Sequence, residues 1–189
     1  MPQRRSFTEL CGKKTLIIGD VGAGKTKLTL KLIKQAIETS HTQDTTIIDM
    51  APATKLVKGR KIGGKLSEVM KIPRQIRYLT PKKVETPRLS AKDAEHLLHL
   101  IKLNHDVILP LLLDFVNNPS PILFVNDISL FFQSGSSEPV LSAVEASETF
   151  IANGYYGKYL AFDYETSISK TEQNLMDMLS NHMHFTIRL

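Results

Sequence analysis

The stretch that most constrains the fold is TLIIGDVGAGKTKLTLKLIK, residues 15–34, in which an apolar, β-branched run meets a glycine-rich turn and then a helical pattern. Lys14–Gly19 predicts a short buried strand that ends at glycine. From Lys25 to about Thr39, leucine and isoleucine recur at helical spacing, which predicts a helix. A strand followed directly by a helix is typical of α/β proteins.

The rest of the chain continues this alternation, and PILFVNDI at Pro121–Ile128 is the strongest buried strand. Alternating strands and helices imply parallel pairing, so we expect an α/β three-layer sandwich with a mainly parallel sheet of about six strands. A length of 189 residues fits one domain, residues 1–189. The other predicted strands are Thr45–Met50, Gln75–Leu79, Lys158–Phe162 and His184–Leu189. Helices are predicted from Ser90 to about Asn118, with a bend or restart near Pro110, from Ser137 to about Ala152 and from Ser169 to about Asn181. Residues 53–75 are expected to form a mobile loop with one helical turn.

Composition excludes several classes of protein. The single cysteine, Cys11, rules out an internal disulfide and suits a reducing compartment. The most apolar region, Leu97–Val116, is interrupted by charged residues and Pro110, so it predicts a buried helix and no membrane span. The first ten residues lack the apolar core of a signal peptide. We therefore expect a cytoplasmic protein.

The turn GDVGAGKT at residues 19–26 fits the pattern G-x-x-x-x-G-K-[ST] at every fixed position. Glycines allow backbone N–H groups to turn inward and approach phosphate oxygens, and the following helix adds its positive dipole end. Lys25 would reach the terminal phosphates, and the Thr26 hydroxyl would hold Mg²⁺. The expected nucleotide-binding residues are Gly19, Asp20, Val21, Gly22, Ala23, Gly24, Lys25, Thr26 and Lys27, and the expected cofactors are ATP and Mg²⁺.

Two acidic residues follow predicted strands at the edge where ligands of parallel sheets collect. Asp127, at the end of ILFVND, is the candidate second holder of Mg²⁺, with a turn-capping role as the alternative. Asp49, at the end of TTIID, is the candidate that orients the attacking water or accepts a proton from a substrate hydroxyl; otherwise it caps the turn into Ala51-Pro52. The expected catalytic residues are therefore Lys25, Asp49 and Asp127.

These motifs resemble those of the P-loop NTPases, and among them the RecA/KaiC-like ATPases most closely. GDVGAGKT is similar to their phosphate loop, TIIDMAP to the strand that brings an acid to the attacking water, and ILFVNDISLFF to their metal-binding strand. The resemblance implies that KYLAFDYETS is an inserted strand that places Asp163 or Thr166 near the terminal phosphate, and that HFTIRL is a closing strand.

The chain also departs from that family. The family usually offers a glutamate as the water-orienting base, whereas Asp49 is shorter, and Asp127 is not followed by Glu. Hydrolysis that is slow, or that needs a partner, would fit these departures. No N-K-x-D element typical of guanine-specific members is present, which favours ATP over GTP.

The net charge of +5 is concentrated in one segment, Lys55–Arg88, which carries eleven Lys or Arg against two Glu. Its cations would suit an anionic protein or a nucleic acid, or would deliver Arg60 or Arg74 to the terminal phosphate of a neighbouring subunit. A solvated basic face is the alternative. Tyr78 is its only aromatic residue, which leaves little for single-stranded bases to stack on.

The remaining clusters are less specific. The pairs His96/His99 and His182/His184 lack a carboxylate or cysteine pattern that would complete a metal site. The tyrosine-rich stretch NGYYGKY at 153–159 predicts a turn, either packed normally or stacked on adenine.

Together these patterns predict a Mg-dependent ATP-binding protein with ATPase activity, in which a basic loop contacts a partner. One alternative is a P-loop kinase with Asp49 as base, which would transfer phosphate to a small molecule or an RNA end. Another is a nucleotide-gated binding module with little turnover. Because a small P-loop protein often completes its site across a subunit interface, we also expect a homo-oligomer.

Overall fold

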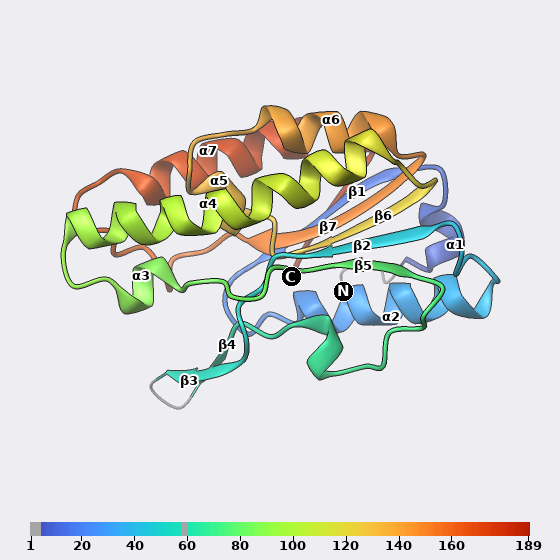
Figure 1. Cartoon of the computed structure of the whole chain (residues 1–189), viewed down its shortest axis with the longest axis horizontal. Coiled ribbons are helices and arrows are strands. Elements are labelled where there is room, and N and C mark those ends of the chain that lie inside the picture. The colour runs from blue at the N-terminus through green and yellow to red at the C-terminus, as the bar shows by residue number, and fades with distance from the viewer. Residues whose placement is uncertain (1–4, 58–59) are drawn as a thin grey trace.

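The computed structural model describes residues 5–57 and 60–189, and its centre is a parallel sheet of six strands in the order β5-β2-β6-β7-β1-β8 (Figure 1). Every neighbouring pair in this sheet runs parallel. The α/β class and the mainly parallel sheet are therefore confirmed. The strands are β1 (Lys14–Gly19), β2 (Thr45–Asp49), β5 (Arg77–Leu79), β6 (Ile122–Asn126), β7 (Thr149–Tyr155) and β8 (Phe185–Arg188).

Helices cover both faces of the sheet, as expected for a sandwich (Figure 1). On one face lie α1 (Phe7–Leu10) and α2 (Lys25–Glu38), and on the other lie α4 (Ala94–Asn117), α5 (Ser129–Phe132), α6 (Glu138–Ala146) and α7 (Ile168–Asn181). The remaining helical elements are η1 (Leu66–Glu68) and α3 (Pro87–Ser90).

Alternation along β1 shows how one strand supplies both hydrophobic cores. Leu16 and Ile18 pack into the core under α4–α7, whereas Ile17 packs into the core under α1 and α2. Successive side chains of a strand point to opposite faces, so a strand with helices on both sides is apolar throughout. This burial on both faces explains why the central strands read as continuous apolar runs.

The strand inserted between β1 and β6 is β7 (Thr149–Tyr155), so the prediction of a strand at Lys158–Phe162 was wrong. The predicted helix to Ala152 ends at Ala146, and the predicted tyrosine turn overlaps the end of β7. Periodicity does not separate a short buried helix from a buried central strand. Gly154 suits its place in the strand because a Cβ there would lie 2.7 Å from Met176 Cε of α7.

The helix predicted from Ser90 instead begins at Ala94, with Asp93 Oδ1 accepting a hydrogen bond from the backbone N–H of His96 at 2.7 Å. This Asp93 contact is a normal N-cap. The helix continues through Pro110 to Asn117 and does not restart there. Ser90 belongs to the separate short helix α3.

The segment predicted as a loop at 53–75 contains an antiparallel hairpin, β3 (Lys55–Val57) and β4 (Arg60–Ile62), followed by η1. The single helical turn was expected, but the hairpin was not. Figure 1 shows the hairpin projecting away from the main sheet on the α2 side. Lys58 and Gly59, which belong to the predicted loop and to the basic segment, lie outside the described residues. No helix in the described parts of the chain is long and apolar enough to cross a membrane.

Candidate functional site

The loop between β1 and α2 holds two glycines in left-handed backbone conformations. Gly22 has a φ of 78° and Gly24, the N-cap of α2, has a φ of 95°. A Cβ at either position would meet nothing within 4 Å, so backbone conformation and not space is what favours glycine there. Gly24 supplies no side-chain cap, which leaves the first amides of α2 available to a ligand.

Lys25, the first residue of α2, is folded back over this loop. Its Nζ donates to the carbonyl oxygens of Gly19 at 2.9 Å and Asp20 at 2.8 Å. Burial lowers the pKa of Lys25, and the carboxylates of Asp127 and Asp20 oppose that shift. The ammonium is therefore held where strand, loop and helix meet, next to the loop amides.

Asp127 lies one residue after β6 in a left-handed conformation with a φ of 62°. Such a conformation costs a residue other than glycine roughly 1–2 kcal/mol. It is held by a hydrogen bond from its backbone N–H to Asn153 Oδ1 at 3.1 Å and by Ser129 Oγ, which donates to Asp127 Oδ1 at 3.2 Å. Burial raises the pKa of Asp127, and the Lys25 ammonium opposes the shift.

The loop between β1 and α2, the ends of β6 and β7 and the helix α3 together line one pocket. Of the predicted site residues, Val21, Gly22, Lys25, Thr26 and Asp127 line it, whereas Gly19, Asp20, Ala23, Gly24, Lys27 and Asp49 do not. Across the described residues, no three His, Cys, Asp or Glu side chains gather as a metal site. Mg²⁺ is commonly held by one or two protein groups together with phosphate oxygens, and Thr26 and Asp127 are a pair of that kind.

Asp49 does not face this pocket. It is completely buried, and Oδ2 accepts from the Tyr78 hydroxyl at 2.5 Å and from the Leu66 N–H at 2.7 Å. Oδ1 accepts from Asn126 Nδ2 at 2.8 Å and from the Ala51 N–H at 3.2 Å. With four donors on it, the carboxylate ties β2, β5, β6 and η1 together, so this arrangement gives no support to a water-orienting role for Asp49.

A chain of buried amides connects Asp49 to the pocket. Asn126 Oδ1 accepts from Asn153 Nδ2 at 2.8 Å, and the same nitrogen donates to Thr29 Oγ1 at 2.9 Å. Asn153 Oδ1 in turn accepts the backbone N–H of Asp127. Asn126 therefore links the carboxyl ends of β2, β6 and β7.

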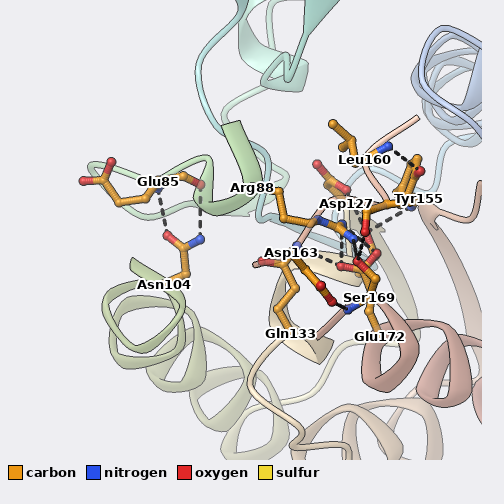
Figure 2. Close-up of polar contacts among 12 residues, drawn as sticks. Glu85, Arg88, Asn104, Asp127, Gln133, Tyr155, Leu160, Asp163, Ser169 and Glu172 are labelled. Carbon is orange, nitrogen blue, oxygen red and sulfur yellow. Dashed lines mark hydrogen bonds and ion pairs between the residues drawn. The ribbon is translucent and has the colours of Figure 1, made fainter. Parts of the chain in front are cut away.

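Three further residues of the site were not among the site residues predicted from the sequence. Figure 2 shows Arg88 from α3, Gln133 after α5 and Glu172 from α7 gathered beside Asp127. Both Arg88 and Gln133 line the pocket. Arg88 Nη2 donates to both oxygens of Glu172, at 2.9 and 2.8 Å, and the side chains of this ion pair are 4% and 3% exposed. Burial raises the pKa of Glu172, and Arg88 opposes the shift.

The segment after β7 is attached to the loop between β1 and α2 through Asp20. Asp20 Oδ1 accepts the N–H of Val21 at 2.6 Å, and Oδ2 accepts the N–H of Lys158 at 3.1 Å. A Cβ on Gly157 would lie 2.4 Å from Asp20 Cγ, so the carboxylate occupies the space of a side chain there. Asp20 thus connects the segment between β7 and α7 to the loop between β1 and α2.

Asp163 and Thr166, expected near the terminal phosphate, do not line the pocket. Asp163 Oδ2 accepts the N–H of Ser169 at 2.9 Å in the first turn of α7, and Thr166 Oγ1 donates to the Asp163 carbonyl at 2.6 Å. Both residues therefore shape the start of α7. Tyr164, Glu165 and Ser167, in the same segment, all have positive φ angles.

Several cations of the basic segment are engaged within the molecule. Arg77 donates to Asp114 Oδ2 at 2.7 Å, and Lys65 Nζ donates to the Pro81 carbonyl at 2.7 Å. Arg74 is exposed, whereas the side chain of Arg60 lies outside what the structure describes. An extended polyanion would therefore meet fewer free cations than the sequence count suggests.

A scan against models of known protein families finds no match for this chain. A search of curated proteins likewise finds no relative. The class of protein must therefore be argued from the geometry of the pocket.

Proposed function

We propose that this protein is a P-loop nucleotide-binding protein that binds ATP with Mg²⁺ and hydrolyses it. The observation that carries the proposal is that Lys25, Thr26 and Asp127 line one pocket, although Asp127 is about a hundred residues away in the chain. The resemblance to RecA/KaiC-like ATPases implied an inserted strand at KYLAFDYETS, but the strand that separates β1 from β6 is β7.

Each residue has a distinct part in this proposal. The amides around Gly22 and Gly24 and the N-terminus of α2 would hold the phosphate oxygens. Lys25 would move from the carbonyls of Gly19 and Asp20 to the terminal phosphates and neutralise the charge that grows during transfer. Thr26 and Asp127 would hold the magnesium ion, which would polarise the terminal phosphate.

The kinase alternative loses its expected base, because both oxygens of Asp49 are occupied within the fold. No other described contact identifies a phosphate acceptor. A partner on the basic segment and assembly into an oligomer stay predictions from the sequence.

A calorimetric titration with ATP or GTP, with and without Mg²⁺, tests the binding step. Lys25→Ala should weaken ATP binding roughly 10- to 150-fold, since hydrogen bonds to charged groups contribute about 1.5–3 kcal/mol each. Lys31→Ala is the matched control, because Lys31 is exposed on the same helix, does not line the pocket and is not among the expected nucleotide-binding residues.

Release of labelled phosphate from γ-labelled ATP tests the second step. Free phosphate supports hydrolysis, whereas label on a small molecule or RNA end would instead indicate a kinase. If neither ATP nor GTP binds at millimolar concentration in the presence of Mg²⁺, the proposed function is wrong.

A further inference from the structure

Hydrolysis of ATP requires a water molecule held in line with the terminal phosphate, and the expected residue for that task is not in the pocket. Asp49 is buried with four donors on it. Of the described residues that line the pocket, only Asp127 is acidic, and it belongs to the proposed metal site. Among the described residues that line the pocket, the groups left to orient the water are therefore neutral acceptors.

Most side-chain acceptors in that lining already receive a hydrogen bond. Asn126 Oδ1 accepts from Asn153, and Asn153 Oδ1 accepts from the backbone of Asp127. Ser129 Oγ accepts the N–H of Tyr155 and donates to Asp127. These groups therefore hold the pocket wall together.

Gln133 is different. It is only 3% exposed, and its Oε1 has no hydrogen-bond partner among the described residues. A buried amide oxygen without a donor is costly to the fold, so such an atom indicates a group that the pocket is built to receive. Gln133 follows α5, six residues after Asp127, so the same short unit carries the proposed metal ligand and this oxygen.

Neighbouring charges fix the orientation of the Gln133 amide. Its Nε2 donates to Glu172 Oε2 at 2.8 Å, and Glu172 is held by two bonds from Arg88 (Figure 2). A carboxylate paired with a guanidinium accepts hydrogen bonds, so the nitrogen of the amide must face Glu172 and the oxygen must face away from it. The Arg88–Glu172 pair thus positions Gln133 and leaves Oε1, in a residue that lines the pocket, without a donor among the described residues.

We propose that Gln133 Oε1 accepts a hydrogen bond from the water that attacks the terminal phosphate of ATP, an inference that rests on the proposed function. The water oxygen bonds to the terminal phosphorus while the bond from that phosphorus to the bridging oxygen breaks, and the electron pair leaves with ADP. Gln133 takes no proton; the proton of the water passes to the released phosphate. Gln133 thus orients the water, and Arg88 and Glu172 are positioning residues.

The central experiment compares Gln133→Met with Gln173→Met. Gln173 is the matched control, because it is an exposed glutamine on α7 and does not line the pocket that contains Lys25 and Gln133. Gln133→Met removes the acceptor and should lower the rate of phosphate release on the order of 10²-fold, as loss of correct positioning does. The affinity for ATP should change less than about twofold, because the water and not the nucleotide is the partner of Gln133. Gln173→Met should retain wild-type rates.

A double variant, Gln133→Glu with Glu172→Gln, separates orientation from structural support. It allows a hydrogen bond between the two positions, keeps the net charge and still presents an oxygen at position 133, while it leaves Arg88 one acceptor oxygen at position 172 instead of two. It should release phosphate at least about tenfold faster than Gln133→Met.

The outcomes separate this inference from the proposed function. If the wild-type protein releases phosphate and Gln133→Met does so equally fast, the role of Gln133 is wrong while the ATPase stands. If ATP affinity falls as much as turnover, Gln133 belongs to binding and the inference is also wrong. If the wild-type protein binds ATP without releasing phosphate, both hydrolysis and this role fail. Should Gln133→Met not fold, a folded but inactive double variant would overturn the inference.

Discussion

At the scale of single residues, the proposed site contains side chains whose interactions within the folded chain are weaker than the interactions they would make with the proposed ligand. Lys25 is satisfied by two carbonyl oxygens, and a triphosphate would offer it full negative charge instead. Burial raises the pKa of Asp127, and a bound cation would lower it again. Asp49, by contrast, has the four donors it needs and gains nothing from a ligand.

The lowered pKa of Lys25 predicts how nucleotide binding depends on pH. A neutral amine does not attract phosphate, so ATP affinity should fall as the pH rises, beginning below the usual lysine pKa of about 10.4. Calorimetric titrations from about pH 7 to about pH 10 measure this. Lys25→Arg keeps its charge over that range and should give a flatter profile, because arginine titrates above about pH 12. Parallel profiles for the two proteins would contradict the prediction.

At the scale of elements, the sequence predicted β1, β2, β5, β6 and β8 because each is a short apolar or β-branched run bounded by glycine, proline or polar residues. It failed at β7, where TFIANGY contains Asn153 and Gly154. These residues are set by contacts far away in the chain, with Thr29 of α2 and Met176 of α7. A pattern of neighbouring residues contains no record of such contacts.

Gly63 directly follows the β3–β4 hairpin, lines the pocket and packs closely against Pro52. Its φ is 76°, and a Cβ there would lie 2.9 Å from both Pro52 Cγ and the Pro52 carbonyl oxygen. Gly63→Ala should therefore lower the free energy of unfolding by more than the roughly 1–2 kcal/mol that a left-handed conformation alone costs.

Gly12→Ala is the matched control for that change. Gly12 has a similar φ of 70°, but a Cβ there meets nothing within 4 Å. Urea denaturation of both variants measures the difference, which reports the close approach of Pro52 to Gly63. Equal losses in the two variants would show that Pro52 moves aside.

At the scale of the whole molecule, the carboxyl ends of parallel strands bring Lys25, Thr26 and Asp127 to one pocket. The sequence anticipated this meeting because the glycine-rich motif and Asp127 each follow a predicted strand, and the carboxyl ends of parallel strands share one edge of the sheet. It did not anticipate Arg88, Gln133 and Glu172, which come from three elements and meet only when α3, α5 and α7 pack. Their spacing in the chain follows no motif.

Ligand binding to the folded state alone should raise the stability of the entire chain. At a hundredfold excess of Mg-ATP over the dissociation constant, the gain is about 2.7 kcal/mol. For a protein of this size that corresponds to a rise in Tm of roughly 5–10 °C. Differential scanning fluorimetry with and without Mg²⁺ measures it, with Asp127→Asn as the variant that should lose the magnesium-dependent part. An unchanged Tm in saturating Mg-ATP would count against the pocket as a nucleotide site.

The contact between Asp20 and Gly157 has a consequence for evolution. The carboxylate of one residue fills the volume that a side chain on the other would need, and backbone N–H groups on both sides hold it there. Substitution at either position alone would leave a gap or a collision. Among descendants of a common ancestor, the two positions should therefore change in concert, with a larger residue at 157 accompanied by a smaller one at 20.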